Sequence, residues 1–391
     1  MNFVEFSHVR LSAIASVVPA EEMRLVDEAA YYGGDLRKID RIRKMAGIDR
    51  RRIAPEGVTF SDLSIQAAET LFKENNVDRN GVDALICVSQ SPDYPVPGTA
   101  FILHKALGLP PACAAFDINL GCSGYIYGLW MASSLIESRA GRRVLLLVGE
   151  VYHRYINPAN RITAPLFGDA STASLLEYAD DAAPLSFSMG SDGNGYEAII
   201  RPGGGARIPH LPGSPDDADY LATVPDADGN PWTVGGYGNL WMDGMAVFAF
   251  TMTVVNDHIL AHLAHKNITP KNLDKLILHQ ANKQIVQNLA LSCEFTPEQA
   301  PWETMSKYGN QAGASIPVTI CDQLKSACDA GDRLRLMLCG FGIGLSWGSC
   351  LGDFTGLHCT GVHDFVPQTS PPGRAEQIAY WHKKFEGEGN G

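Results

Sequence analysis

The chain has 391 residues, 45% of them hydrophobic, and a formal net charge of −12 from 31 basic and 43 acidic side chains. This length and apolar content exclude a disordered chain and predict two domains or one large duplicated domain. The negative charge argues against general binding to nucleic acids or anionic membranes. Any anionic partner would have to meet a local basic patch.

The nine cysteines indicate a reducing compartment. Their number is odd and no two form a C-x-x-C pair, so neither a zinc ribbon nor a disulfide framework fits. We therefore expect free thiols in a cytoplasmic protein. The N-terminal run LSAIASVVPA is too short for a signal peptide and lacks leading cations, so it is predicted to be a strand ending at Pro19. We expect no uninterrupted apolar stretch long enough to span a bilayer, and no membrane association.

Short apolar runs alternate with helical patterns along the first half. Strands are predicted over 82–89, 114–119 and 142–150. A helix is predicted over about 99–107 after the first strand, and a long helix that ends at Gly141 follows the second. This alternation predicts a layered α/β fold.

The second half repeats this plan. LDKLILHQ (273–280) matches VDALICVS (82–89) at an offset of 191, and AGDRLRLMLCG (330–340) matches AGRRVLLLVGE (140–150) at an offset of 190. Two matches at nearly one offset predict an internal duplication. The alternative is that buried strands resemble one another by chance.

Three parts of the chain are predicted. They are an N-terminal half (1–180), a C-terminal half (181–355) and a C-terminal extension (356–391). The Pro-, Gly- and Asp-rich stretch 202–236 is predicted to be a long loop that forms a lid or a pocket wall. After Phe354 the alternating pattern ends, and RAEQIAYWHKKFEG is predicted to be a short docking helix beyond a Pro-rich linker.

Cys122 lies in DINLGCSGYIYG, where a predicted strand turns into the long helix. Free backbone N–H groups and the helix dipole at such a turn favour a thiolate and can hold an oxyanion. Gly121 and Gly124 would let a substrate or another backbone approach closely. Most cysteines are small buried hydrophobes, as we expect for the other eight, but the turn favours a nucleophile here.

The offset of the duplication places the Cys122 turn onto Ala312, within YGNQAGAS. Two equivalent turns would then face each other and form one shared site, because open α/β folds bind ligands at the carboxyl ends of strands. His279 ends the predicted strand in LILHQANKQI, and Asn310 lies in the second turn. Alone, such a His is usually structural and such an Asn a turn former. Together with Cys122 they predict a Cys–His–Asn site.

DHILAHLAHK sets His258, His262 and His265 at helical spacing, as on a metal-binding helix face. The motif lacks the Glu of H-E-x-x-H and lies near a helix C-terminus, where histidine is electrostatically favourable. We predict no metal site.

Five motifs, in order, resemble the β-ketoacyl-acyl carrier protein synthase III family of the thiolase superfamily. They are DINLGCSGYIYG, FGDAST, LHQANKQI, YGNQAGAS and CGFGIGLSWGS, and the resemblance runs from about residue 8 to 354. It implies a duplicated α/β fold, built as a five-layered α-β-α-β-α sandwich, and usually a homodimer. It also implies a catalytic triad of Cys122, His279 and Asn310.

The resemblance implies a mechanism that suits these residue types. Cys122 takes an acyl group from acyl-CoA or an acyl carrier protein (ACP), with the backbone N–H groups of Cys122 and Ile343 as the oxyanion hole. His279 and Asn310 then hold the carbonyl of malonyl-ACP or malonyl-CoA while CO₂ leaves, and the resulting enolate attacks the acyl-enzyme. No metal and no tightly bound cofactor is implied, because phosphopantetheine arrives on the substrates.

Several positions depart from the family pattern and indicate a specialised relative. Arg41 and Met45 stand where the family has a Trp and an Arg that grip coenzyme A. Gln284 replaces an Arg that docks the carrier protein, with Lys283 one step earlier. Val96 replaces a Phe that closes the acyl pocket across the dimer, which predicts room for a larger acyl group.

Residues 37–52 hold eight cations but only two acidic residues, Asp40 and Asp49. Arg41 and Lys44 belong to this run. It is either a docking surface for an acidic carrier protein or CoA phosphates, or a solvated helix face.

Other functions remain open at the level of sequence. A thiolase would need a second reactive cysteine, for which Cys339 is one residue out of place. An acyltransferase could use the same triad to form an ester or amide without decarboxylation. A papain-like protease also orders Cys, His and Asn, but LSWG lacks the Asn that completes its motif. A binding subunit that has lost catalysis is a further alternative. The acyl chain, the donor and the pathway cannot be read from the sequence.

Overall fold

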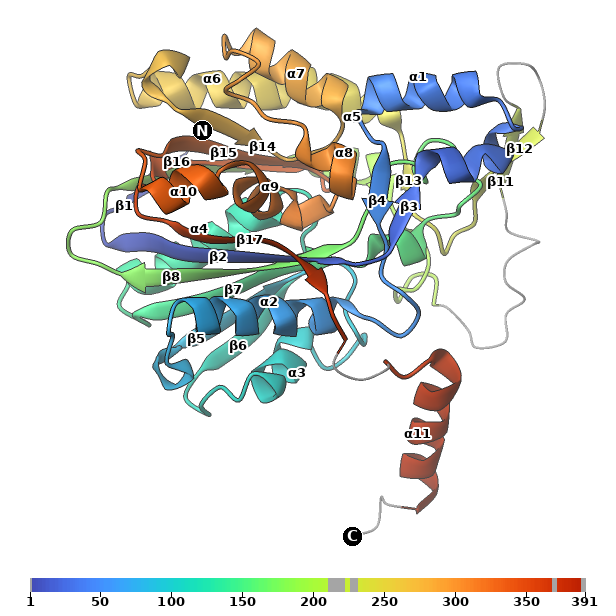
Figure 1. Ribbon diagram of the computed structural model, residues 1–391, viewed down its shortest axis with the longest axis horizontal. Helices are drawn as coiled ribbons and strands as arrows, with labels where there is room; N and C mark the ends of the chain where they lie inside the picture. Colours follow the sequence, from blue (N-terminus) through green and yellow to red (C-terminus); the bar gives the residue numbers. More distant parts are fainter. Residues whose placement is uncertain (1, 210–221, 226–230, 368–370, 388–391) are drawn as a thin grey trace.

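The computed structural model describes residues 2–209, 222–225, 231–367 and 371–387. Two mixed β-sheets form its frame (Figure 1). In spatial order, the first sheet contains β1 (Phe3–Phe6), β9 (Leu185–Ser191), β16 (Ser346–Asp353), β15 (Arg335–Gly342) and β14 (Lys275–Leu278). The second contains β17 (His358–Phe365), β2 (Val9–Pro19), β8 (Ala170–Tyr178), β7 (Arg143–Glu150), β5 (Ala84–Val88) and β6 (Ala114–Ile118).

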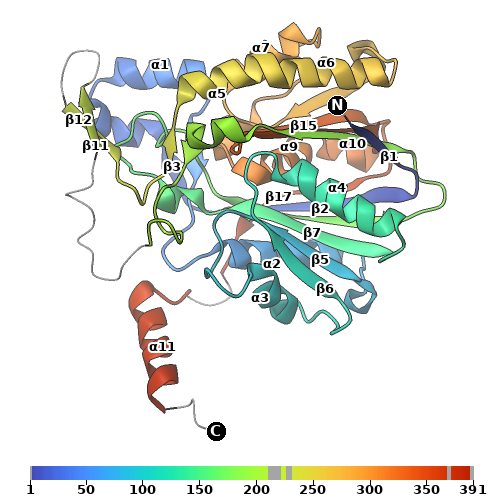
Figure 2. The same cartoon turned by 180° about the vertical axis from the view of Figure 1, so that it is seen from behind.

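Helices form three further layers (Figures 1 and 2). Between the sheets lie α4 (Gly124–Glu137), α9 (Ser315–Gln323) and α10 (Lys325–Ala330). The outer face of the first sheet carries α6 (Asn256–His265) and α7 (Lys283–Ser292), and that of the second carries α2 (Phe60–Glu74) and α3 (Thr99–Ala106). The predicted five-layered sandwich is confirmed.

Smaller elements complete the described chain. The remaining helices are α1 (Leu36–Ala46), α5 (Gly244–Phe250), α8 (Thr304–Tyr308) and α11 (Arg374–Gly387). Three two-stranded sheets pair β3 (Glu22–Arg24) with β4 (Arg50–Arg52), β10 (Ile199–Ile200) with β13 (Trp241–Met242), and β11 (Ala222–Pro225) with β12 (Pro231–Gly235). The predicted C-terminal helix is present as α11 and stands off the body of the molecule (Figure 1).

The central helix α4 is apolar because a sheet covers it on both sides. α4 contacts strands of both sheets, and its sequence GYIYGLWMASSLIE contains one charged residue, Glu137 at its end. A Cβ at Gly128 would lie 2.7 Å from Leu146 on β7, so glycine lets this helix pack closely on the second sheet. The position of α4 matters for function because Cys122 directly precedes it.

The sheets confirm the internal duplication. β5 pairs in parallel with β7, and β14 pairs in parallel with β15. In both sheets the next two strands are antiparallel. The run LSAIASVVP also forms the predicted strand, as part of β2.

Two strands cross between the halves, which modifies the predicted division of the chain. β1, at the N-terminus, pairs with β9 in the sheet of the C-terminal half. β17, in the predicted extension, pairs in parallel with β2 in the sheet of the N-terminal half. The expectation that the layered pattern ends after Phe354 is therefore wrong. The strand HCTGVHDF could not be predicted from apolar periodicity, because it is an edge strand whose polar residues interrupt the apolar run.

One helical run meets the length and composition of a membrane span, contrary to expectation. Gly244–His265 combines α5, the π-helical turn Thr251–Val255 and α6. It lies along the first sheet in the structure, with Val255 and Ile259 fully buried. One such helix is weak evidence for a membrane, since a core helix has the same composition.

The histidines of this run form a buried hydrogen-bond chain instead of a metal-binding face. His258 Nε2 and His262 Nδ1 lie 2.8 and 2.6 Å from Ser349 Oγ, and His262 Nε2 lies 3.0 Å from Ser186 Oγ. His265 stacks on Phe3. Burial lowers the pKa of His258 to about 4 and that of His262 to about 3. Both imidazoles are therefore neutral at pH 7.

The buried hydrogen-bond chain of His258 and His262 predicts that the folded protein loses stability in acid. The unfolded state binds protons at these histidines below about pH 6.5, whereas the folded state does not until about pH 4, so folding stability falls over that window as the pH drops. Each histidine should contribute about 1.4 kcal/mol per pH unit. Urea unfolding at pH 7, 6 and 5 should show a shallower pH slope for His262→Asn than for wild type. His382→Asn, at an exposed position of α11, is the control; equal slopes in all three proteins would contradict the prediction.

Candidate active site

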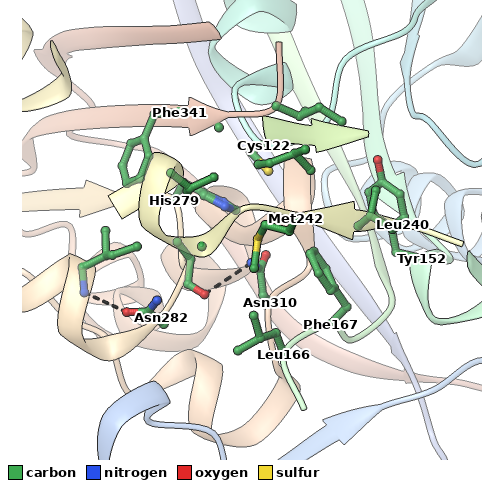
Figure 3. Close-up of a pocket in the computed structure, with 17 residues that line it drawn as sticks. Cys122, Tyr152, Leu166, Phe167, Leu240, Met242, His279, Asn282, Asn310 and Phe341 are labelled. Carbon is green, nitrogen blue, oxygen red and sulfur yellow. Dashed lines mark hydrogen bonds between the residues drawn. The ribbon is translucent and has the colours of Figure 1, made fainter. Parts of the chain in front are cut away.

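A cavity of about 80 Å³ brings the predicted residues together (Figure 3). Cys122, His279, Asn310 and Ile343 all line it, from four separate segments of the chain. Its other walls are mainly apolar and include Tyr152, Leu166, Phe167, Leu240, Met242 and Phe341. The cavity therefore encloses a thiol, an imidazole and an amide in surroundings with little other polarity.

The two turns related by the duplication meet at this cavity, as expected. Cys122 and Ala312 belong to one buried cluster. A Cβ at Gly313 would lie only 2.9 Å from the carbonyl oxygen of Gly121, so the two backbones are in close contact. Each turn begins a central helix, α4 or α9.

The Cys122 thiol is almost fully buried, with 9% of the residue exposed. Burial raises the pKa of this thiol to about 11, and the nearby Glu150 carboxylate adds to the rise. Hydrogen bonds from the backbone N–H groups of Ile343 and Cys122 itself lower the pKa, but by less. The expectation that the turn favours the thiolate is therefore wrong for the free protein, because desolvation outweighs the helix terminus. The two N–H groups nevertheless both act on the sulfur.

Gly342 makes the close approach to the thiol possible. Its φ is +152°, and a Cβ there would lie 2.7 Å from Cys122 Cβ and 2.9 Å from Sγ. The glycines beside Cys122 serve protein packing, since a Cβ at Gly121 would meet Gln90 Oε1 at 2.5 Å and one at Gly124 would meet Val88 at 2.7 Å. Of the two predicted alternatives, another backbone or a substrate, the structure shows close approach of the protein: a Cβ at Gly313 would lie 2.9 Å from the Gly121 carbonyl oxygen.

His279 is held in one orientation and stays neutral. Its Nδ1 lies 2.7 Å from Ser315 Oγ, at the start of α9, and the backbone N–H of Gln280 donates to the same Oγ at 3.3 Å. The ring also meets Phe341 edge-on. Burial lowers the pKa of His279 to about 4. A neutral imidazole whose Nδ1 receives the Ser315 proton carries its own proton on Nε2 and can donate it.

The Asn310 amide is oriented by its own turn. Its Oδ1 accepts from the backbone N–H of Ala312 at 2.9 Å, and its Nδ2 donates to the carbonyl of Ala281 at 3.4 Å (Figure 3). The backbone N–H of Asn310 donates to Leu166 at 2.8 Å. Since the oxygen is occupied, the NH₂ group is the part of this side chain that can serve a ligand.

Several of the cations in residues 37–52 are paired with carboxylates, so fewer of them are free at the surface than the sequence suggests. Carboxylates from elsewhere in the fold neutralise part of it: Arg50 pairs with Glu22, Arg51 with Glu28 in the interior, and Arg52 with Asp364. Arg37 and Arg43 pair with aspartates close by in the sequence. Arg41 and Lys44 are exposed, and no described residue forms an ion pair with either.

Lys44 and Lys283 line one surface groove between α1 and α7, of about 260 Å³, together with Met45 and Gln284. Lys283 also lies 4.0 Å from the centre of the Trp302 ring. Its neighbour Asn282 lines the active-site cavity, so the groove lies beside the cavity. Arg41 lies one turn earlier on α1 and does not line the groove.

The remaining predicted residues lie in different surroundings. Val96 is 82% exposed and does not line the cavity of its own chain. Cys339 is buried in β15 and does not line the cavity either. Within the predicted 202–236 loop, residues 210–221 and 226–230 lie outside the described part of the chain. Leu240 and Met242, just beyond it, form a wall of the cavity.

Sequence reasoning missed several residues that shape the site. Ser315 belongs to the motif YGNQAGAS, but the sequence predicted no role for it or for Tyr152. The Tyr152 hydroxyl donates to Gln90 Oε1 at 2.5 Å, and Glu150 accepts from the backbone of Gln90 at 2.8 Å. Burial raises the pKa of Glu150 to about 8. Glu150 could have been noticed in the sequence, because it is a charged residue at the end of the apolar strand LLLVGE.

Comparisons with known proteins agree with this fold and site. The family model of 3-oxoacyl-[acyl-carrier-protein] synthase III matches residues 116–193, and the model of its C-terminal domain matches residues 263–354. A putative 3-oxoacyl-[acyl-carrier-protein] synthase 3 of Campylobacter jejuni is 32% identical over 358 residues, covering 91% of this chain and 97% of the relative. A beta-ketoacyl-[acyl-carrier-protein] synthase III of Rhodopirellula baltica is 31% identical, covering 88% and 97%.

Solved structures give the same result. The crystal structure of a 3-oxoacyl-(acyl-carrier protein) synthase from Burkholderia xenovorans LB400 superposes with a TM-score of 0.84 at 32% identity, covering 93% of this chain and 99% of that one. OleA of Xanthomonas campestris, at 19% identity and a TM-score of 0.71, shares the fold.

Fold and site thus define an acyl-transferring condensing enzyme with a thiolase-like fold. The chain belongs to the 3-oxoacyl-[acyl-carrier-protein] synthase III family, whose reaction is a decarboxylative Claisen condensation.

The raised pKa of Cys122 predicts a steep pH dependence of its reactivity. Because only the thiolate is alkylated, the rate of Cys122 modification by iodoacetamide should rise about tenfold per pH unit from pH 7 to pH 10. Peptide mass spectrometry would measure the rate at each pH. A plateau below pH 9 would contradict the prediction.

The contact at Gly342 predicts that even a methyl group blocks the thiol. Gly342→Ala should lower the rate of acyl-enzyme formation by at least about 100-fold, because the new Cβ occupies the space beside Sγ and displaces the N–H of Ile343. Gly193→Ala is the control, because a Cβ at Gly193 would meet nothing within 4 Å. Stopped-flow acylation should separate the two variants, and equal rates would contradict the argument.

Proposed function

We propose that Cys122 receives an acyl group from a CoA or carrier-protein thioester. The observation that carries this proposal is the convergence of two backbone N–H groups, those of Cys122 and Ile343, on the Cys122 sulfur. Donors placed there can stabilise the oxyanion of the tetrahedral intermediate. The thiolate needed for attack is disfavoured by burial, so it forms only as the substrate carbonyl arrives and the developing charge moves to the oxyanion hole. Collapse of the intermediate breaks the C–S bond to CoA or the carrier, and the departing thiolate takes up the proton released by Cys122.

The second half of the reaction is assigned to His279 and Asn310. Decarboxylation of a malonyl thioester places negative charge on the thioester oxygen, and the catalytic requirement is hydrogen-bond donors at that oxygen. A neutral His279 that carries its proton on Nε2 and an Asn310 that offers Nδ2 meet this requirement. The enolate carbon then attacks the acyl carbon on Cys122, and the thiolate leaves.

The chemistry of the site needs no resident cofactor. Both substrates carry their own thioester, and the groups proposed here supply nucleophile and donors. CoA and phosphopantetheine thioesters are accordingly proposed as substrates.

The groove between α1 and α7 is proposed to dock the acidic carrier protein. Arg41 and Lys44 are exposed cations without an ion-pair partner among the described residues, and Lys283 contributes a third charge next to the cavity. In a chain of net charge −12 these cations attract an acidic partner to the cavity entrance.

A cytoplasmic homodimer is proposed on the family resemblance. Val96 is exposed on the loop that follows β5, and it would reach a second copy rather than its own cavity. The expectation that Val96 leaves room for a larger acyl group depends on that second copy and remains a prediction.

The roles of the triad can be separated by mass spectrometry and by CO₂ release. With a panel of acyl-CoA and acyl-ACP donors, the intact protein should gain the mass of the acyl group, and Cys122→Ala should not. His279→Ala and Asn310→Ala should still be acylated but lose about 10²–10³-fold in CO₂ release from malonyl thioester. An acyl adduct that survives Cys122→Ala would overturn the proposal. Acylation without CO₂ release in wild type would instead support an ester- or amide-forming acyltransferase.

Charge reversal tests the docking surface. Arg41→Glu combined with Lys44→Glu should raise the KM for malonyl-ACP about tenfold and leave the KM for malonyl-CoA nearly unchanged, because only the carrier protein spans the groove. Lys73→Glu, an exposed site on α2 in the opposite outer layer, is the matched control. An unchanged KM for malonyl-ACP would remove the docking surface from the proposal.

A further inference from the structure

Three cysteines gather at one place outside the active site. Cys321 lies in the last turn of α9, Cys328 lies on α10 and Cys359 lies on β17. Cys328 Sγ and Cys359 Sγ are 3.1 Å apart, although 31 residues separate them in the sequence. Neither thiol lines the Cys122 cavity. The sulfurs are already in contact, so only a small movement would bring them to the bond length of about 2.05 Å.

The three thiols differ in access. Cys328 is half-buried, whereas Cys359 is fully buried and Cys321 is 2% exposed. An oxidant from solvent therefore reaches Cys328 first. Cys321 Sγ is hydrogen-bonded to the carbonyl of Ile14 at 3.7 Å and also forms a hydrogen bond with the Cys359 thiol.

The surroundings of Cys328 favour its thiolate. The hydrogen bond from the Cys359 thiol lowers the pKa of Cys328, and the Lys325 ammonium one helical turn earlier lowers it further, against burial and Asp329, which raise it. Lys325 Nζ also donates to the backbone carbonyl of Cys359 at 3.2 Å and so ties α10 to β17. The Cys122 thiol, by contrast, has its pKa raised. Low pKa and access together mark the thiol that oxidises first.

We propose that Cys328 and Cys359 are an oxidisable pair that closes into a reversible disulfide between α10 and β17. The Cys328 thiolate attacks a hydroperoxide, breaks its O–O bond and becomes a sulfenic acid, while the alcohol or water leaves. The Cys359 sulfur then attacks the sulfenic sulfur and expels water. In total, two thiols and one hydroperoxide give one disulfide, water and the alcohol or a second water, a two-electron oxidation.

The bond would fasten an edge strand to the central layer. β17 is held by β2 on one side only, and its pairing with β2 is irregular between Cys359 and Val362. α10 follows directly on α9, the central helix whose first residue, Ser315, contacts His279. A cross-link at Cys328–Cys359 would restrain this edge of the sheet and so stabilise the fold.

Oxidation of the full chain tests the pair. After one equivalent of hydrogen peroxide, the intact mass should fall by two hydrogen atoms, and a non-reducing peptide map should join the peptides of Cys328 and Cys359. Dithiothreitol should restore the original mass. The melting temperature of the oxidised protein should exceed that of the reduced protein by about 5 °C.

Variants identify the sulfurs. Cys328→Ser and Cys359→Ser should each abolish the cross-link and the shift in melting temperature, whereas Cys113→Ser, at a single distant thiol, should keep both. Cys328 is half-buried and Cys359 is buried, so Cys328→Ser is the variant expected to fold normally. If Cys359→Ser fails to fold, Cys328→Ser still tests the proposal. A cross-link through Cys321, over-oxidation of Cys328 without a cross-link, or oxidation of Cys122 before Cys328 would overturn the proposal.

Discussion

The close approach between the end of β15 and the Cys122 turn is the constraint on which the rest of the site depends. Gly342 lies against Cys122 with no space for a Cβ, and this contact brings the N–H of Ile343 to the sulfur. β15 belongs to one sheet and the turn leads from the other, so the contact exists only because α4 is packed between the sheets. The layers therefore position the two N–H groups that are proposed to form the oxyanion hole.

Burial at this contact has opposite effects on the two ionisable groups of the site. It raises the pKa of Cys122 and lowers that of His279, so both are neutral in the free protein. Neutral groups suit a reaction in which charge appears only when the substrate arrives and is then met by oriented donors. Ser315 and Ala312 orient those donors from the second turn, which is why both copies of the duplicated unit are needed.

The fold reduces the positive surface charge that the sequence of residues 37–52 predicts. Residues 37–52 read as a continuous basic run, but distant carboxylates such as Glu22, Glu28 and Asp364 neutralise part of it. What is left is a short cationic patch at Arg41 and Lys44, beside Lys283. For the proposed docking of a carrier protein, a specific patch next to the cavity suits better than a diffuse basic face, because it also sets orientation.

The sequence by itself determined the layered α/β class and the duplication, and it predicted Cys122, His279 and Asn310 as the site residues, because strand periodicity and motif order are local and repeat at nearly one offset. Only the tertiary structure decided the pKa of Cys122, the role of Gly342 and the place of β17, since burial, close backbone contact and edge pairing arise between segments far apart in the chain. The contact between the Cys328 and Cys359 sulfurs also depends on the tertiary structure. The spacing of the two residues in the sequence does not indicate this contact, which results from the packing of α10 on β17.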